Sequence, residues 1–276
     1  MTWQLRRFTM LSALAILALV STQQHQVYAA EPGETGVVHA ILVAATNDPS
    51  IGTSVQADLK KMQDFFAGFK AKNRLGQVVS VVGDDCSMKG VADAFAAINV
   101  GEADTLVFYY AGHGVNVNRG GVGHSLGLNP KELLIRSDLR GLMQSKRARL
   151  AIMITDTCNS YLDKTELKGA NPAEWETLRC LFLVPRGLVD VNSVTEGESA
   201  YGNEKGGFFT AAFLDTLGDK FATLDRDGDK FLHWHEIIPD VQKRVQTRYA
   251  GYRTETLPQW EKALSTLQNA GHTFVE

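Results

Sequence analysis

The chain has 276 residues, of which 44% are hydrophobic, and its formal net charge is -3 at pH 7. This length suits one α/β domain with its own core. Because the charge is close to neutral and Lys and Arg form no long run, electrostatics give no case for nucleic acid or an anionic membrane as partner.

The N-terminal segment, residues 1–29, is predicted to be a secretory signal peptide. Arg6 and Arg7 form a positive region, residues 10–20 an apolar region, and residues 27–29 a small-x-Ala-like cleavage site. The apolar region is too short for a transmembrane helix, which needs about 20 residues. We therefore expect a secreted or periplasmic protein without stable membrane insertion after cleavage; an uncleaved anchor is the alternative.

After this segment, apolar β-rich runs alternate with helical patterns. Strands are predicted over residues 37–45, 78–82, 106–110, 150–155 and 188–194. Helices are predicted over residues 54–71, around 91–98, around 139–143 and near 209–217. This order predicts a mostly parallel sheet with helices on both faces, whose functional groups gather beyond the carboxyl ends of the strands. Residues 114–129 and 163–186 show little pattern, and we expect the second of these segments to be an exposed loop.

Two residues with catalytic chemistry directly follow two predicted strands. His113 lies between Gly112 and Gly114 after the third strand, and Cys158 follows the fourth. If these strands are parallel neighbours, imidazole and thiol emerge at one edge of the sheet, where such a pair acts as base and nucleophile. The flanking glycines would let a substrate backbone come close. A lone Cys or His is more often a packing or solvated residue, but the pair indicates a cysteine hydrolase.

The chain carries the motifs YAGHG at residues 110–114 and DTCNS at residues 156–160. They resemble the motifs of caspase-like cysteine peptidases, particularly metacaspases and their bacterial relatives. The resemblance implies a caspase-like three-layer sandwich over residues 30–276 and an endopeptidase that acts on proteins or peptides without an organic cofactor. It also implies His113 as base, Cys158 as nucleophile, and the amides of Gly114 and Cys158 as oxyanion hole.

Two other functions stay open at this point. One is a catalytically silent caspase-fold scaffold or Ca²⁺-binding interaction module, which would have no need of His113 or Cys158. The other is a different cysteine hydrolase on an α/β sheet, which fits the Cys–His pair but leaves the spacing of Asp156 unexplained.

Asp156 lies two residues before Cys158 and would face the same way on an extended strand. A carboxylate there raises the pKa of the thiol, which opposes activation unless the substrate brings a cation. In metacaspase-like relatives the matching Asp lines the pocket for a P1 Arg or Lys, so the resemblance implies substrates with basic residues. The alternative is an Asp that caps the following turn.

A second constellation of polar residues occupies residues 225–236. Its oxygen donors have the spacing of an EF-hand loop: Asp225, Asp227, Asp229, the Phe231 carbonyl and Glu236. Hard oxygen ligands suit Ca²⁺, and a single loop predicts weak binding. Lys230 stands where the pattern has Gly in a turn with positive φ. An Asp-rich turn before a helix that starts near Trp234 is the alternative.

The three cysteines, Cys86, Cys158 and Cys180, do not form a disulfide framework. In an oxidising compartment an odd count leaves at least one free thiol or an intermolecular bond. A bond between Cys86 and Cys180 would leave Cys158 free, and the sequence leaves that pairing open.

Overall fold

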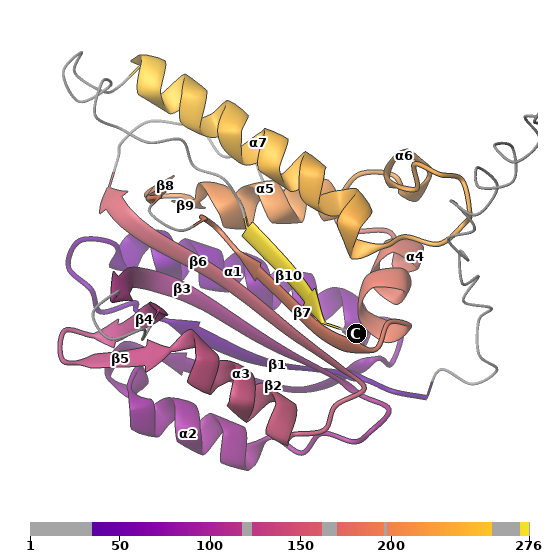
Figure 1. Cartoon of the computed structure of the whole chain (residues 1–276), viewed down its shortest axis with the longest axis horizontal. Coiled ribbons are helices and arrows are strands. Elements are labelled where there is room, and N and C mark those ends of the chain that lie inside the picture. The colour runs from indigo at the N-terminus through magenta and orange to yellow at the C-terminus, as the bar shows by residue number, and fades with distance from the viewer. Residues whose placement is uncertain (1–34, 118–122, 162–169, 196–197, 256–270, 276) are drawn as a thin grey trace, which may run out of the picture. The chain divides into compact units, whose positions relative to one another are not determined.

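The structure is a computed structural model that describes residues 35–117, 123–161, 170–195, 198–255 and 271–275. The predicted signal peptide lies outside the described residues. The central strands have the order β10-β7-β6-β3-β1-β2 (Figure 1). Their bounds are β1 (Val38–Ala44), β2 (Leu75–Val82), β3 (Thr105–Val117), β6 (Leu150–Tyr161), β7 (Gly187–Asn192) and β10 (Gly271–Val275). Neighbours pair in parallel except β10, which runs antiparallel to β7.

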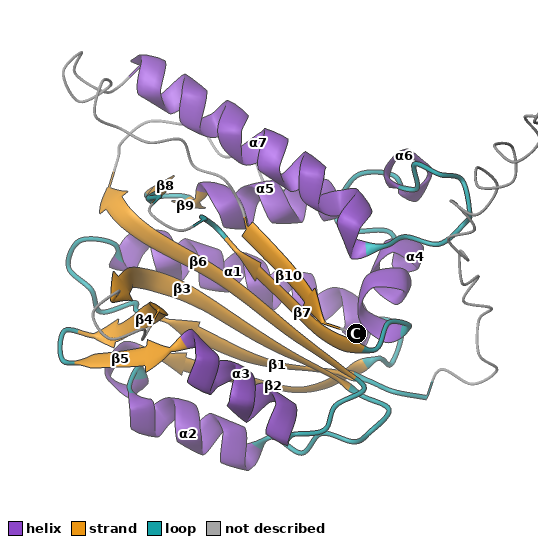
Figure 2. Ribbon diagram, viewed as in Figure 1, coloured by secondary structure: helices purple, strands orange, loops and turns teal. Residues whose placement is uncertain are grey.

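Helices cover both faces of this sheet, which confirms the predicted fold class (Figure 2). One face carries α2 (Met88–Ala97) and α3 (Arg136–Ser145). The other face carries α1 (Gly52–Lys70), α5 (Phe208–Leu217) and α7 (Trp234–Glu255). Shorter pieces are η1 (Gly83–Asp85), α4 (Trp175–Leu178), the π-turn η2 (Arg179–Leu183) and α6 (Phe221–Leu224).

Strand residues alternate between two cores. All of β1 is buried, as expected for a parallel strand covered on both faces. Tyr109 of β3 and Ile152 of β6 pack with α1 and α5, whereas their neighbours Phe108 and Met153 pack with α2 and α3. The alternation therefore assigns each strand residue to one helical layer, and it extends toward the strand ends where the catalytic candidates lie.

The prediction of little regular structure over residues 114–129 is wrong for the part that the structure describes. Strand β3 runs on to Val117 and pairs antiparallel with β4 (Gly123–Asn129), which pairs with β5 (Glu132–Ile135). Leu126 and Leu128 of β4 are buried in the core beneath α2 and α3. Frequent Gly and Asn hid the alternation of buried and exposed residues along β4. Burial of the two leucines outweighed the low strand propensity of Gly and Asn.

The prediction of an exposed loop over residues 163–186 is also wrong in its second half. There the chain forms α4 and η2, and Cys180, Leu181 and Phe182 are fully buried. Phe182 packs edge-on against Phe69 of α1 and Trp234 of α7. The apolar run is too short to show a period, which is why its burial was missed. Residues 162–169 lie outside the described part.

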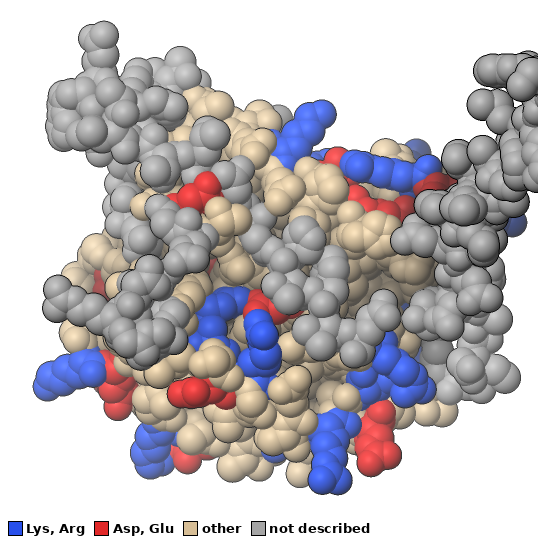
Figure 3. Space-filling view, viewed as in Figure 1, with Lys and Arg blue, Asp and Glu red and all other residues tan. Residues whose placement is uncertain are grey.

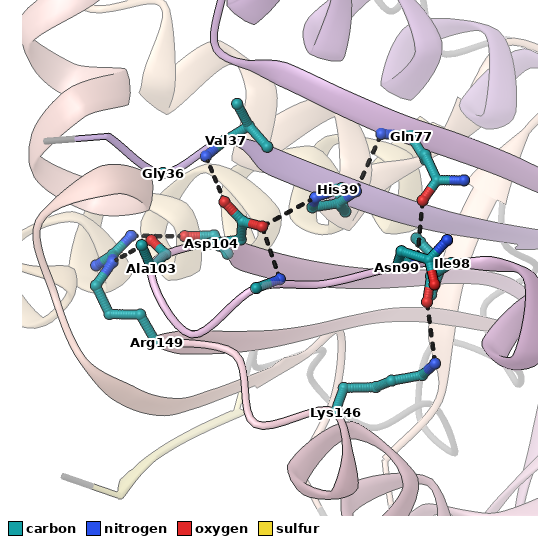
Figure 4. A network of polar contacts seen from close by, with 12 residues as sticks. Gly36, Val37, His39, Gln77, Ile98, Asn99, Ala103, Asp104, Lys146 and Arg149 are labelled. Carbon is teal, nitrogen blue, oxygen red and sulfur yellow. Dashed lines mark hydrogen bonds and ion pairs between the residues drawn. The ribbon is translucent and has the colours of Figure 1, made fainter.

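A polar network closes the amino ends of β1, β2 and β3 (Figure 4). The Asp104 carboxylate accepts hydrogen bonds from the backbone N–H of Val37 at 2.9 Å and of Gly101 at 2.8 Å. His39 Nε2 lies 3.3 Å from Asp104 Oδ2, and its Nδ1 accepts the Gln77 N–H at 3.0 Å. His39 therefore belongs to the framework of the sheet.

Charges are mixed on the visible face of the molecule, where Lys and Arg alternate with Asp and Glu instead of gathering in one basic patch (Figure 3). Among the helices that the structure describes, none is both long and apolar enough to cross a membrane.

Candidate active site

The register of β3 and β6 brings the two catalytic candidates to one place. The strands pair in parallel from Thr105 with Leu150 up to Gly112 with Thr157. His113 and Cys158 are the next residue on each strand, at the carboxyl edge of the sheet. The side chain of Cys158 lies outside the described part, but its backbone pairs with Ala200 of β8 (Ala200–Asn203). That ladder shifts register directly after the cysteine, the kind of bulge that is frequent beside active sites.

The backbone of His113 is held from two sides. It pairs with Gly127 of β4, and the Tyr110 hydroxyl lies 2.8 Å from the His113 carbonyl and 2.7 Å from the Gly127 carbonyl. A Cβ on Gly112 would lie 2.2 Å from the Tyr110 hydroxyl oxygen, so this contact requires glycine. Because Tyr110 is itself fully buried, the part of β3 that carries His113 is fixed to the core.

At Gly114, too, a neighbouring residue occupies the space that a side chain would need. A Cβ there would lie 2.7 Å from Cβ of Thr157 on the adjacent strand. Neighbouring side chains of the protein therefore explain both glycines, and the approach of a substrate backbone stays a prediction. Close packing of β3 against Tyr110 and Thr157 takes up the space of the missing side chains. The Gly114 amide as an oxyanion donor stays a prediction.

Two residues that sequence reasoning missed, Asp48 and Ser50, contact the imidazole. They lie between β1 and α1. His113 Nε2 is 3.2 Å from Asp48 Oδ2 and 3.3 Å from Ser50 Oγ. The side chain of His113 is 40% exposed and that of Asp48 19% exposed, so the pair lies at the surface of the sheet edge. The available signal was a carboxylate at the carboxyl end of the strand next to the one that carries His113.

The Asp48 carboxylate is held in its ionised form. Its Oδ1 accepts hydrogen bonds from the Ser50 N–H at 2.8 Å, the Ser50 hydroxyl at 2.6 Å and the Ile51 N–H at 3.1 Å. Burial raises the pKa of Asp48, but these hydrogen bonds and the nearby His113 outweigh burial, so the pKa lies below its ordinary value. A fixed negative charge therefore faces the imidazole.

Asp156 is placed inside the protein, 1% exposed, at the N-terminus of α5. Its Oδ2 accepts the Thr210 N–H at 3.0 Å and the Thr210 hydroxyl at 2.7 Å. Tyr109 in turn lies 2.8 Å from the Thr210 hydroxyl. Asp156 therefore caps a helix that follows it by about fifty residues in the chain, a role close to the alternative considered for it. Whether it also meets substrate stays a prediction.

A second buried carboxylate, Asp58 of α1, lies near Asp156 and was missed in the sequence. Asp58 accepts the Gly207 N–H at 2.7 Å and lies 3.2 Å from Lys61 Nζ. Burial raises its pKa to about 7, with Lys61 opposing and Asp156 adding to that rise. The signal was its position on the buried stripe of α1, three residues after Val55. The end of β6 thus rests on two acids, one of which readily holds a proton.

The segment predicted as an EF-hand loop, residues 225–236, connects α6 to the first turn of α7. One carboxylate oxygen from each of Asp225, Asp227 and Asp229 lies within 4.8 Å of the other two. Lys230 adopts the left-handed φ of 68°, as its place in the pattern requires, and its N–H donates to Asp225 at 3.1 Å. Glu236 is buried and accepts backbone N–H groups of the same loop, from Arg226 at 3.0 Å and His233 at 2.8 Å. The Phe231 carbonyl stays a predicted ligand.

Cys86 and Cys180 are free and buried, and they belong to cores on opposite faces of the sheet. The pairing that the sequence left open is therefore absent. Burial, with a smaller contribution from Glu132, raises the pKa of the Cys86 thiol to about 11. Neither thiol is prepared for reaction with solvent reagents.

Comparisons with known proteins bear on this site. A family profile described as "Caspase domain" matches residues 52–267. Among solved structures, protein GSU0716 from Geobacter sulfurreducens is similar with a TM-score of 0.50 and 15% identity, covering 86% of this chain and 93% of that one. The Drosophila initiator caspase Dronc gives a TM-score of 0.49 and 11% identity, covering 86% and 78%. At 15% identity the likeness to the Geobacter protein concerns the fold alone. A comparison with curated proteins finds no match.

Proposed function

Since the chain belongs to the caspase-domain family, whose profile matches residues 52–267, we propose that it is a cysteine endopeptidase with a Cys158–His113 pair. The observation that carries the proposal is the register of β3 and β6, which puts these two residues side by side at the carboxyl edge. In a parallel sheet that edge is where functional groups gather.

The proposed reaction uses His113 as the acid and base. It takes the Cys158 proton, and the thiolate attacks the carbonyl carbon of the scissile peptide. The amides of Gly114 and Cys158 would donate hydrogen bonds to the oxyanion of the tetrahedral intermediate. His113 then returns the proton to the leaving amine, and a thioester forms. Water, deprotonated by His113, hydrolyses the thioester and restores the thiol.

We propose Arg or Lys as the P1 residue of the substrate. The resemblance of the DTCNS segment to metacaspases supports this preference, and so does the buried carboxylate of Asp156 beneath the strand end. Because Asp156 is deeply buried, only a long cationic side chain would reach it. A bidentate Arg contact would be stronger than a Lys point charge.

We also propose that the 225–236 loop binds Ca²⁺. The three clustered aspartates and the left-handed Lys230 fit such an ion. Asp225, Asp227, Asp229, the Phe231 carbonyl and Glu236 would hold it, with weak affinity as expected for one isolated loop. Bound Ca²⁺ would supply positive charge that draws these carboxylates together.

Export to the periplasm or the cell exterior is proposed from the sequence of residues 1–29. Mass spectrometry of protein recovered from an expressing bacterium should find a new N-terminus near Ala30. An intact Met1 in the membrane fraction would instead favour the uncleaved anchor.

The central experiment measures hydrolysis of a fluorogenic Arg peptide, with and without Ca²⁺, by the wild type and by Cys158→Ala. We expect hydrolysis by the wild type alone. A parallel alkylation at mildly acidic pH with peptide mapping should label Cys158 before Cys86 or Cys180, because both of those thiols are buried. The silent scaffold is favoured if the wild type neither cleaves any peptide nor reacts first at Cys158.

A further inference from the structure

We propose that Asp48 is the positioning residue for His113, so that the site works as a Cys158–His113–Asp48 triad. This inference rests on the proposed function. It goes beyond the two-residue site that the sequence predicts, because the contact joins segments 113 − 48 = 65 residues apart.

The hydrogen bonds of Ser50 indicate which ring nitrogen of His113 carries the hydrogen. The Ser50 hydroxyl is 2.6 Å from Asp48 Oδ1, and a carboxylate only accepts, so the hydroxyl proton points to Asp48. Ser50 Oγ then faces His113 Nε2 as an acceptor, at 3.3 Å, as does Asp48 Oδ2 at 3.2 Å. With two acceptors in front of it, Nε2 carries a hydrogen. His113 must therefore serve the Cys158 thiol through Nδ1.

The loop holds Asp48 in this place independently of His113. Backbone N–H groups of Ser50 and Ile51 bind its carboxylate, and the Asp48 carbonyl accepts the Gly52 N–H at 2.8 Å where α1 begins. Ile51 is buried in the core next to α1. The carboxylate is thus anchored by the framework and is ready to receive the imidazole in one orientation.

The effect on reactivity follows from charge. When the thiol proton moves to Nδ1, a thiolate and an imidazolium form, and a carboxylate opposite Nε2 stabilises the imidazolium. Among the described residues, the other titratable groups near this site include His124, beside Gly114, and the buried acids Asp58 and Asp156. Burial, assisted by Arg136, lowers the pKa of His124 to about 4, so it stays neutral where His113 acts.

The test compares Asp48→Asn with the wild type, and Asp84→Asn serves as the matched control. Asp84 is a carboxylate near the same loop, where it accepts a hydrogen bond from Asn47 at 2.8 Å. The rate of Cys158 alkylation is measured between about pH 5 and 8, where a His changes charge. Since Asp58 and Asp156 are present in all three proteins, their titration cancels in the comparison.

We expect Asp48→Asn to slow alkylation at neutral pH about tenfold and to move the acidic limb of the profile up by about one pH unit. The control should match the wild type. A role in folding alone would lower the melting temperature of Asp48→Asn without moving the limb. An unchanged profile in Asp48→Asn, in a wild type that cleaves peptides, would overturn the triad and leave the proposed peptidase standing.

A second measurement separates this inference from the peptidase itself. In Cys158→Ala, ¹⁵N resonances of the His113 ring report which nitrogen carries hydrogen, whatever the activity. We expect the Nε2–H tautomer, and a mixture of tautomers after Asp48→Asn is added. A mixture in both proteins would overturn the positioning role even if peptides are cleaved.

Discussion

Two His–Asp pairs connect the same two strands, β1 and β3, at their opposite ends. At the amino edge His39 of β1 faces Asp104, which precedes β3, with Nε2 and Oδ2 3.3 Å apart. At the carboxyl edge His113 of β3 faces Asp48, which follows β1, at 3.2 Å. The two pairs have the same chemical groups and nearly the same contact distance. Residue type and distance therefore do not distinguish a structural His–Asp pair from a catalytic one.

Exposure and neighbours separate the two pairs. The His39 side chain is 7% exposed, whereas that of His113 is 40% exposed. In the pair at the amino edge, backbone N–H groups donate to both residues. Nδ1 of His39 accepts the Gln77 N–H, and Asp104 accepts two further backbone N–H groups. At the carboxyl edge, the strand next to His113 instead brings a cysteine into line. A His–Asp pair becomes a candidate for catalysis where the imidazole is accessible and the neighbouring strand carries a cysteine beside it.

Removing each histidine should give the largest contrast. We expect His113→Ala to lower kcat/KM about a thousandfold, because general acid–base catalysis contributes roughly 10²–10⁴. His39→Ala should instead lower the free energy of unfolding by about 2 kcal/mol, since it removes the buried imidazole together with its contacts to Asp104 and the Gln77 N–H. Urea unfolding and peptide hydrolysis per folded molecule measure the two effects. Equal kinetic losses in both variants would break the distinction between the edges.

The 225–236 loop, for which we propose Ca²⁺ binding, should behave as part of the amino edge of the sheet. Trp234 at the start of α7 donates from Nε1 to the Leu181 carbonyl at 3.0 Å, and the next carbonyl, of Phe182, accepts a hydrogen bond from Thr105 at the beginning of β3. At 100 times its Kd, Ca²⁺ bound to the folded state alone should stabilise it by about 2.7 kcal/mol. We expect thermal melts to rise with Ca²⁺ in the wild type and not in Glu236→Gln.

Because this chain of contacts leads away from His113, Ca²⁺ should leave the pH profile of Cys158 alkylation unchanged. Identical melts with and without Ca²⁺ in the wild type would reduce the loop to a structural turn. A Ca²⁺-dependent profile would show that the two edges are coupled.

The buried acids at the carboxyl edge should make stability depend on pH. The folded protein holds the Asp58 proton up to about pH 7, whereas the unfolded chain releases it near its ordinary value of 3.8. The stability contributed by protonated Asp58 is therefore fully present below about pH 4 and is lost as pH rises through 7. We expect the wild type to lose about 4 kcal/mol relative to Asp58→Asn over this window. Urea unfolding at both ends measures it, and a constant difference would contradict the raised pKa.

The position of the parallel strands along the chain, and of His113 and Cys158 directly after two of them, followed from local sequence. Apolar runs such as residues 150–154 mark strands that are covered on both faces, and a reactive residue directly after such a run lies at the strand end by necessity. The hairpin of β4 and β5 did not follow, because its Gly and Asn residues conceal the burial of Leu126 and Leu128.

Contacts between residues far apart in the chain could not be predicted from local sequence either. Asp48 meets His113 only through the pairing of β1 with β3, and Asp58 meets Asp156 only where α1 packs against Gly207. Each acid has an ordinary local context, after a strand or within a helix. Their roles depend on which strands become neighbours, and that is decided by packing of the whole core.

The smallest effect concerns Asp156, whose side chain would serve both substrate specificity and the structure of α5. As a specificity acid it should bind a P1 Arg, so Asp156→Asn should lower kcat/KM for Arg peptides at least tenfold, or about 1.4 kcal/mol. As a cap of α5 it should contribute about 1 kcal/mol to stability. Thr210→Val is the matched control, because it removes the 2.7 Å hydroxyl contact with Asp156 and keeps the charge.

We expect both variants to melt earlier and only Asp156→Asn to lose activity on Arg peptides per folded molecule. Alkylation of Cys158 should stay intact or become faster in Asp156→Asn, because a nearby negative charge is gone. If Thr210→Val loses activity equally, the carboxylate acts only by holding α5 in place. A wild type that prefers Asp over Arg at P1 would also remove Asp156 from specificity, while the contrast between His113 and His39 would stand.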